Sequence, residues 1–305
     1  MNKLRRAPRR QVDGVLLLDK PSGITSNAAL QKVRRLLNAA KAGHTGTLDP
    51  MATGLLPLCF GEATKFAGEL LDADKSYRAT LKLGVTTDTA DAEGRVLIIR
   101  QVGVTEEQWR AATADFQGET EQVPPMHSAL KRDGRPLYEY ARAGIEVERE
   151  PRHVTIQRIE TISFRGDEAT IDVDCSKGTY IRTLAADIGE RLGCGAHLTA
   201  LRRTCIGTLT LAGAASLDRL EALTLAERDD CLAPPDALLA GVPEARLDER
   251  QMEQIVHGQR IPWRGETGQR YRLYGSGVFL GVGELTSDGW LNPKRLVASE
   301  IGEKR

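Results

Sequence analysis

The sequence predicts an α+β protein, with a mixed, mainly antiparallel sheet flanked by helices and a small β-rich domain at the C-terminal end. Residues 169–175 alternate, with Ile171 and Val173 on one side and Asp172 on the other, as in a half-buried antiparallel strand. Segments with apolar residues at helical spacing stand between such strands. Short strands separated by glycines occupy residues 271–285. These patterns favour one large mixed domain followed by a smaller β-rich one.

The first part of the chain predicts one buried strand and one helix. Residues 14–18 form a short apolar run suited to a buried strand, which Pro21 ends. A helix follows from about Ser26, the expected N-cap, and its apolar residues keep helical spacing as far as Leu37. Gly43 ends this helix and leads the chain into the next segment.

The middle of the chain alternates strands and helices. Residues 76–84 alternate as a strand does, and residues 88–94 form a polar loop. This loop superficially resembles a calcium site, but Ala90 stands where the third ligand is expected, so we predict no calcium there. Thr105 and Gln108 form a capping box for a helix with Trp109 on its apolar face.

Four further segments complete the prediction. Residues 124–152 form an excursion rich in Pro, Gly and Arg, with a short helix at 137–142. Another helix begins after Thr179. The acidic segment 216–245 is expected to be helical with a break at 233–235, and residues 247–257 to form a helix ended by Gly258.

Composition narrows the class of protein. The 305 residues are 41% hydrophobic and 28% charged, as in an ordinary globular protein. No run of about 18 apolar residues suggests a membrane span, and residues 1–10 lack the apolar core of a signal peptide, so we expect a cytoplasmic protein. The five cysteines form no C-x-x-C pair, and no glycine-rich phosphate loop is present. We therefore expect neither a metal nor any other cofactor.

The formal net charge is zero, but the charge is unevenly distributed. Residues 216–255 carry ten acids and four bases, a net charge of −6, so the remainder carries +6. Five of its bases lie in the first ten residues: Lys3, Arg5, Arg6, Arg9 and Arg10. Such a basic arm often contacts phosphates, although it can also be a solvated tail without a role.

The segment 43–54 is the most informative part of the sequence about function. It sets the carboxylate of Asp49 among three glycines, which allow close approach of the backbone to a ligand, and His44 lies five residues upstream. Pro50 holds Asp49 in an extended conformation. The same pair also suits a helix start, with Asp49 as N-cap and Pro50 at the first helical position. Spacing alone leaves both interpretations open.

This segment resembles the G-H-x-G-x-L-D-P-x-A-x-G motif of the TruB family of tRNA pseudouridine synthases. Further segments resemble the same family in the same order along nearly the whole chain: 14–21, 61–65, 75–78, 87–91, 128–131, 138–142, 175–182, 193–197, 201–203 and 291–296. The resemblance implies a pseudouridine synthase catalytic domain at 13–245 after a basic arm at 1–12. It also implies that residues 124–152 are an RNA-binding insertion, and that residues 246–305 are a PUA-like RNA-binding β-barrel.

The resemblance also assigns roles to single residues. Asp49 is the expected catalytic carboxylate, Arg182 its cationic partner, and Tyr180 lies near C5 of the base. Tyr77 and Leu201 would pack on the two faces of the target ring, and His44 would contact the RNA or fill the space that flipped nucleotides leave. The basic residues expected to contact phosphates are Lys20, Lys65, Lys131, Arg132, Arg142, Arg202 and Arg203.

The implied activity is isomerisation of uridine to pseudouridine at position 55 in the T-loop of tRNA. The reaction needs one carboxylate against a flipped-out nucleotide in a cavity that excludes water, and no redox cofactor. Asp49 could attack the sugar, attack the ring, or remove a ribose proton, and the sequence does not choose among these. We expect a monomer that binds the tRNA T-arm and no nucleotide cofactor. A non-catalytic RNA-binding or RNA-folding protein is the alternative from another class.

Overall fold

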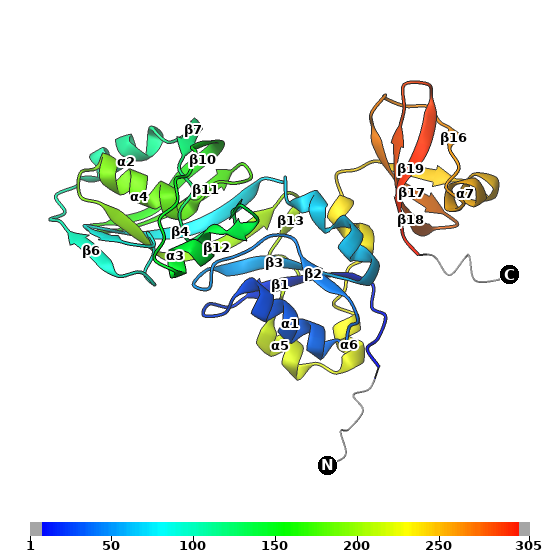
Figure 1. Ribbon diagram of the computed structural model, residues 1–305, viewed down its shortest axis with the longest axis horizontal. Coiled ribbons are helices and arrows are strands. Elements are labelled where there is room, and N and C mark those ends of the chain that lie inside the picture. The colour runs from blue at the N-terminus through cyan, green and yellow to red at the C-terminus, as the bar shows by residue number, and fades with distance from the viewer. Residues whose placement is uncertain (1–7, 299–305) are drawn as a thin grey trace, which may run out of the picture.

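The computed structural model describes residues 8–298, which form two large sheets with helices around them and two small hairpins (Figure 1). The basic residues Lys3, Arg5 and Arg6 lie outside the described residues. Arg10 lies within them, and its guanidinium pairs with Asp229 at 2.6 Å. For this residue the expected contact with phosphate is replaced by an ion pair within the protein.

The larger sheet has ten strands and is mixed but mainly antiparallel, as predicted. Only β1 with β14 and β3 with β12 pair in parallel. The main path of the sheet runs through β14 (Ala215–Ser216), β1 (Gly14–Lys20), β3 (Thr53–Phe60), β12 (Ala196–Ile206), β4 (Lys75–Leu83), β11 (Glu168–Cys175), β10 (Arg152–Arg165) and β7 (Gly118–Gln122). Off this path, β2 (Ala42–His44) pairs with β3, and β13 (Leu209–Thr210) pairs with β12.

Helices cover the two halves of this sheet separately (Figure 1). α4 (Ile181–Arg191) packs on β12 and β4, and α2 (Glu106–Ala114) packs beside it on β10. α1 (Ser26–Leu36) packs on β2 and on α5 (Leu217–Ala222), which α6 (Leu225–Asp229) follows. The short 3₁₀ helices η1 (Gly61–Leu70) and η2 (Pro235–Leu239) contact each other. No helix within 8–298 is both long and apolar enough to cross a membrane.

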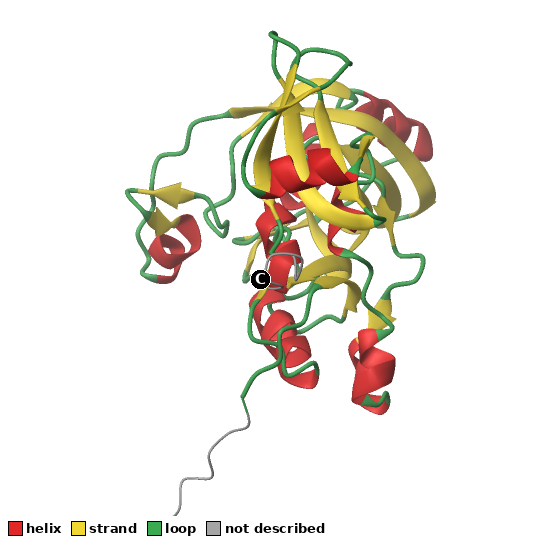
Figure 2. Cartoon of the chain, turned by 90° about the vertical axis from the view of Figure 1, so that its right-hand side faces the viewer, coloured by secondary structure: helices red, strands yellow, loops and turns green. Residues whose placement is uncertain are grey.

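Two hairpins lie apart from both large sheets. β5 (Val85–Thr87) pairs with β6 (Val96–Ile99), and β8 (Lys131–Arg132) pairs with β9 (Arg135–Pro136). The second hairpin continues into α3 (Leu137–Arg142), the short helix predicted for the insertion. Figure 2 shows this part as a lobe of two short strands and one helix that stands out from the body of the protein.

Most local predictions are confirmed, but two at the first helix are wrong: its N-cap, and its end, which lies at Leu36 and not at Gly43, a residue of β2. The capping box of Thr105 and Gln108 is present in both directions. At α1, however, Thr25 is the N-cap, and its hydroxyl accepts from the amide of Ala28 at 3.1 Å. Ser26 is buried, and its side chain is used elsewhere. Both hydroxyls stand at the start of the same helix, so sequence alone could not separate them.

The C-terminal part is a curled five-stranded sheet, as expected for a PUA-like domain. Its order is β15 (Glu244–Leu247), β17 (Arg270–Gly275), β18 (Val278–Leu285), β19 (Trp290–Leu296) and β16 (Ile261–Pro262), with α7 (Glu249–Val256) packed against it. The helix expected at 247–257 therefore starts two residues later, because Leu247 ends β15. The boundary at 245/246 stays a prediction, and β15, the first strand of the sheet, crosses it.

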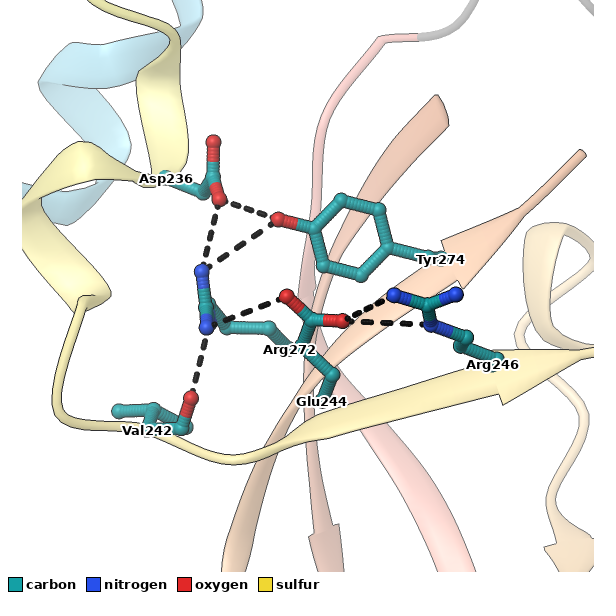
Figure 3. A network of polar contacts seen from close by, with 6 residues as sticks. All are labelled: Asp236, Val242, Glu244, Arg246, Arg272 and Tyr274. Carbon is teal, nitrogen blue, oxygen red and sulfur yellow. Dashed lines mark hydrogen bonds and ion pairs between the residues drawn. The ribbon is translucent and has the colours of Figure 1, made fainter. Parts of the chain in front are cut away.

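An apolar cluster and a polar network join this sheet to the larger domain. Phe66 of η1 packs edge-on against Phe279 of β18, with ring centroids 5.5 Å apart. Beside them, Arg272 of β17 donates to Asp236 of η2 at 3.0 Å, to the carbonyl of Val242 at 2.8 Å and to Glu244 at 3.4 Å (Figure 3).

The hydroxyl of Tyr274 completes this network by donating to Asp236 (Figure 3). Burial, together with the Asp236 carboxylate, raises the pKa of Tyr274 to about 12, so the phenol stays protonated and keeps donating. Asp236 is only 7% exposed, and Arg272 and Tyr274 are the two side chains that donate to it.

We expect Arg272→Met to lower the melting temperature by several degrees, because it leaves the Asp236 carboxylate buried without its cation. Arg246→Met is the matched control, since Arg246 pairs with Glu244 in the same network but its side chain is 85% exposed. The control should melt within about 1 °C of the unmodified protein. Thermal unfolding measured by circular dichroism compares the two, and equal shifts would show that the buried network adds nothing.

Candidate active site

Asp49 lies between β2 and β3, in a segment that neighbouring elements hold from both sides. The hydroxyl of Ser26 on α1 donates to the carbonyl of Leu48 at 3.0 Å and accepts from its amide at 2.8 Å. From β12, the guanidinium of Arg203 donates to the carbonyls of Leu55 at 2.8 Å and Thr47 at 3.4 Å. The backbone on either side of Asp49 is therefore anchored to two different elements.

No helix follows Pro50, so the helix-cap interpretation of Asp49 is wrong. The amide of Ala52 donates to the carbonyl of Asp49 at 3.1 Å in a turn, and β3 begins at Thr53. Gly54 has φ 99°, and a Cβ atom there would lie 2.2 Å from the carbonyl oxygen of Arg203. Only glycine permits this contact between β3 and β12, which brings the segment against the sheet.

The side chain of Asp49 meets the guanidinium of Arg182 in the first turn of α4. Nε of Arg182 lies 3.0 Å from Oδ2 of Asp49, and the other nitrogens donate to the carbonyls of Thr89 at 3.1 Å and His127 at 2.7 Å. The Arg182 side chain is 5% exposed, whereas that of Asp49 is 35% exposed. The arginine is thus fixed on three sides, and the carboxylate it holds remains open to a ligand.

A second carboxylate, Asp91, lies 3.7 Å from the same Nε of Arg182. It is buried, and its Oδ1 accepts from the Thr89 hydroxyl at 2.6 Å and from the amide of Glu93 at 3.1 Å. Ala90 between them has φ 58° and accepts from the amide of Leu198, which ties this loop to β12. Two carboxylates therefore share one buried guanidinium.

These neighbours act on the pKa of Asp49 in opposite directions. Burial raises this pKa and is the largest effect, the charge and hydrogen bond of Arg182 lower it, and the charge of Asp91 raises it. The balance leaves the pKa of Asp49 above the ordinary value for aspartate. A carboxylate of this kind is a stronger base and nucleophile when ionised than one on the open surface.

Asp49 and Arg182 line a cavity of about 380 Å³ together with Tyr77, Tyr180 and Leu201. All five were expected at the site from the sequence, and they come from the Asp49 segment, β4, the start of α4 and β12. A second cavity of about 650 Å³ shares Asp49 and Arg182 with the first. The volumes lie in the range of small-molecule sites.

The second cavity opens toward the insertion. Its wall includes His44, Lys131, Tyr138 and Arg142, and the last two stack with the guanidinium 5.3 Å from the ring centroid. His44 is half-buried, and burial lowers its pKa, which favours the neutral imidazole at pH 7. Asp49 therefore stands where the smaller cavity meets a larger one with basic groups at its edge.

Tyr180 is positioned through its backbone. The side chain of Gln122, which is 3% exposed, accepts from the Tyr180 amide at 2.9 Å and donates to its carbonyl at 3.3 Å. Burial raises the pKa of Tyr180, and the nearby Ser128 hydroxyl lowers it by less. The phenol is therefore protonated at neutral pH and faces the cavity from the N-terminal side of α4.

Comparison with known proteins places this geometry in a family. A profile described as "TruB family pseudouridylate synthase (N terminal domain)" matches residues 34–181, and two TruB C-terminal profiles match residues 182–240 and 243–297. A protein of Azoarcus sp. named "tRNA pseudouridine synthase B" is 60% identical over 98% of this chain and 99% of its own. One of the same name from Dechloromonas aromatica is 58% identical over 94% and 96%.

The chain belongs to the TruB family. It is accordingly a pseudouridine synthase, an isomerase, and the family resemblance read from the sequence is confirmed. Among solved structures, one in "Crystal Structure of a Cbf5-Nop10-Gar1 Complex" matches with a TM-score of 0.70 and 25% identity, over 93% of this chain and 84% of that chain. The predicted pseudouridine synthase fold with a PUA-like domain is thereby confirmed.

Two of the expected phosphate contacts are wrong for this TruB-family protein. Lys20 is fully buried, and its ammonium donates to the carbonyls of Pro21, Ile24 and Pro50 at 2.9, 2.7 and 3.2 Å. Burial lowers its pKa to about 8. Arg203 is also buried, so neither side chain can reach an RNA backbone. Both instead hold the backbone around Asp49.

The other basic residues divide into two groups. Lys131, Arg132 and Arg142 are exposed on the insertion, where their contact with RNA remains a prediction. Arg202 pairs with Asp19 at 2.7 Å and Lys65 with Glu62 at 2.6 Å. Lys65 also donates to the carbonyl of Leu296 at 2.9 Å, which ties β19 to η1. RNA contacts from these two stay predictions, and their charges are already balanced.

Asp91, Gln122 and Ser128 also belong to the site, although the sequence does not predict them there. Asp91 stands inside a segment that resembles the family, but there we considered only calcium. Gln122 lies in a strand with no unusual pattern, and Ser128 begins a segment in which we singled out the basic residues. Each becomes visible only when the fold brings residues 89–91 and 122–128 to the start of α4.

Proposed function

We propose that this protein converts uridine to pseudouridine at position 55 in the T-loop of tRNA. The observation that carries the proposal is the ion pair of Asp49 and Arg182 in a cavity bounded by Tyr77, Tyr180 and Leu201. The relatives named tRNA pseudouridine synthase B support tRNA as the substrate. All of these groups come from one chain, which supports a monomer, and a tRNA substrate supports action in the cytoplasm.

In this mechanism the target nucleotide leaves the RNA stack and enters the cavity with Asp49 at its sugar and base. The N1–C1′ bond breaks, the base turns, the C5–C1′ bond forms, and the proton on C5 is released while N1 takes up a proton. Arg182 keeps Asp49 ionised for this work, although burial alone would favour the neutral acid. Tyr77 and Leu201 hold the base between them, and Tyr180 lies close to C5.

The two cavities differ in the residues that line them, and each suits a different part of the RNA. The smaller one is bounded by aromatic and apolar groups and suits the flipped pyrimidine. The larger one carries His44, Lys131 and Arg142 and suits the neighbouring nucleotides and phosphates. Flipping costs a few kcal/mol of stacking, which these contacts offset.

Tritium release tests the reaction directly. tRNA carrying uridine labelled with tritium at C5 should release one tritium for each pseudouridine formed, and sequencing after modification should place it at position 55. A protein that only binds or folds RNA releases none. Tritium released from a uridine at another position would support the isomerase reaction and contradict position 55 as its target.

The affinity for tRNA should fall steeply with salt, despite the zero net charge of the chain. About four phosphate contacts would weaken binding by roughly a hundredfold between 50 and 200 mM salt, because each contact releases condensed counterions. Filter binding or fluorescence anisotropy measures this slope. A flat salt response would contradict an RNA interface built from basic residues.

Single variants locate that interface. Lys131→Ala and Arg142→Ala should each reduce the logarithmic salt slope by about one. Arg110→Ala is the matched control, since Arg110 is also exposed but lies on α2 and pairs with Glu106. An effect of the control as large as that of the insertion variants would place the RNA elsewhere.

A further inference from the structure

Arg203 is a buried cation whose partners do not balance its charge. It is 2% exposed and lies on β12. Nε and Nη1 donate to the backbone carbonyls of Leu55 and Thr47, while Nη2 is buried without a hydrogen-bond partner of ordinary length. Within 8–298 it forms no ion pair with a carboxylate. Burying a charged group without a balancing partner costs free energy of folding, so a specific partner is expected.

Tyr77 is the side chain placed to be that partner. Arg203 and Tyr77 are directly opposite each other in the antiparallel pairing of β12 with β4. Residues opposite each other in this way project to the same face, with their Cβ atoms about 5 Å apart. Tyr77 lines the smaller cavity, and so does Thr47, whose carbonyl Arg203 already binds.

The electrostatics of the two groups agree with this placement. Burial raises the pKa of Tyr77, and the charge of Arg203 beside it lowers that pKa in part. Burial also lowers the pKa of Arg203, and Tyr77 raises it. Each group therefore offsets part of what burial does to the other.

We propose that Arg203 is a positioning residue for Tyr77: Nη2 donates to the phenol oxygen and so fixes the ring in the cavity wall. A phenol oxygen that accepts from a guanidinium directs its own O–H away from it, here toward the cavity. Through Thr47 and Leu55, Arg203 holds the backbone on both sides of Asp49. One buried guanidinium thus sets the ring and the carboxylate relative to each other. The proposal rests on the proposed function in so far as Tyr77 contacts the target base.

Tyr77→Phe tests the contact in the free protein, because it removes one hydroxyl and keeps the ring. The variant leaves the buried Nη2 without its acceptor, so we expect the melting temperature to fall by about 3–8 °C. Tyr271→Phe is the matched control, since Tyr271 is a half-buried tyrosine of β17 that packs against apolar residues. The control should melt within about 1 °C of the unmodified protein.

A double-mutant cycle assigns the loss to Arg203. In an Arg203→Met background, Tyr77→Phe should lower the melting temperature by less than half of the fall that it causes alone. Arg203→Lys is the background if the Met variant does not fold. Equal losses in both backgrounds, or no loss from Tyr77→Phe alone, would overturn the contact.

The positioning role has its own readout. Tyr77→Phe should lower the single-turnover rate about tenfold and leave tRNA affinity unchanged, because the ring still stacks but its hydroxyl no longer orients it. An unchanged rate would overturn the role. Failure of the proposed function is distinguishable, since it appears as absence of tritium release in the unmodified protein while the unfolding cycle remains intact.

Discussion

Replacing Asp49 by Asn is expected to lower turnover on tRNA by at least about 10⁴-fold, because no other group in the cavity can supply an ionised carboxylate at its position. Asn matches Asp in size and leaves the contacts that anchor the segment, which run through the backbone of Leu48, Thr47 and Leu55. The affinity for tRNA should therefore stay within roughly tenfold. Tritium release under single-turnover conditions measures the rate, and anisotropy measures binding.

The control for this substitution is Asp172→Asn. Asp172 lies on β11 and pairs with Arg78 at 2.7 Å on the outside of the same sheet, so its loss removes an ion pair but no group of the cavity. This variant should keep full turnover. Appreciable residual activity in Asp49→Asn would remove Asp49 from the chemistry and leave the cavity as a binding site only.

Arg182→Met is expected to lower the single-turnover rate about 10²- to 10³-fold and to move its acid limb to higher pH. The sign follows from the pKa of Asp49, which burial raises and Arg182 lowers. Without the guanidinium this pKa rises further, so the carboxylate is protonated, and the enzyme inactive, up to a higher pH. Rates measured from pH 5 to 9 would show the shift.

Two further variants separate this effect from misfolding. Arg182→Lys keeps a positive charge but cannot make the three contacts to Asp49, Thr89 and His127 together, so it should lose rate with a smaller shift of the acid limb. Arg191→Met removes an exposed arginine from the same helix and should change neither. An acid limb that stays in place in Arg182→Met would show that the pair does not control Asp49.

The local structure of the chain was largely readable from the sequence. The strand at Glu168–Cys175, the capping box at Thr105 and the helix at Leu137–Arg142 follow from periodicity and short-range hydrogen bonding, which neighbouring residues determine. The N-cap of α1, which is Thr25 where Ser26 was predicted, shows the limit of such prediction. Ser26 has the right chemistry for a cap, but a residue 22 positions away uses its hydroxyl.

The basic residues show the same limit more sharply. Lysine and arginine are expected on the surface, and charge patterns cannot tell a phosphate contact from a structural one. Lys20 and Arg203 are buried because the carbonyls of the turns around Asp49 need donors that those turns cannot provide for themselves. Lys65 and Arg272 hold the C-terminal sheet through contacts more than 30 residues apart in the chain.

The family of this protein and the candidate groups Asp49, Tyr77, Tyr180 and Arg182 are predictable from short ordered motifs, which can be matched residue by residue. The contacts that hold these groups come from the packing of the folded chain: Asp91 lies beside Arg182, Gln122 binds the backbone of Tyr180, and Arg203 lies opposite Tyr77. These partners come from strands and loops far apart in the chain. Whether a charge is buried and what balances it depends on every element packed around it, and no local pattern records that.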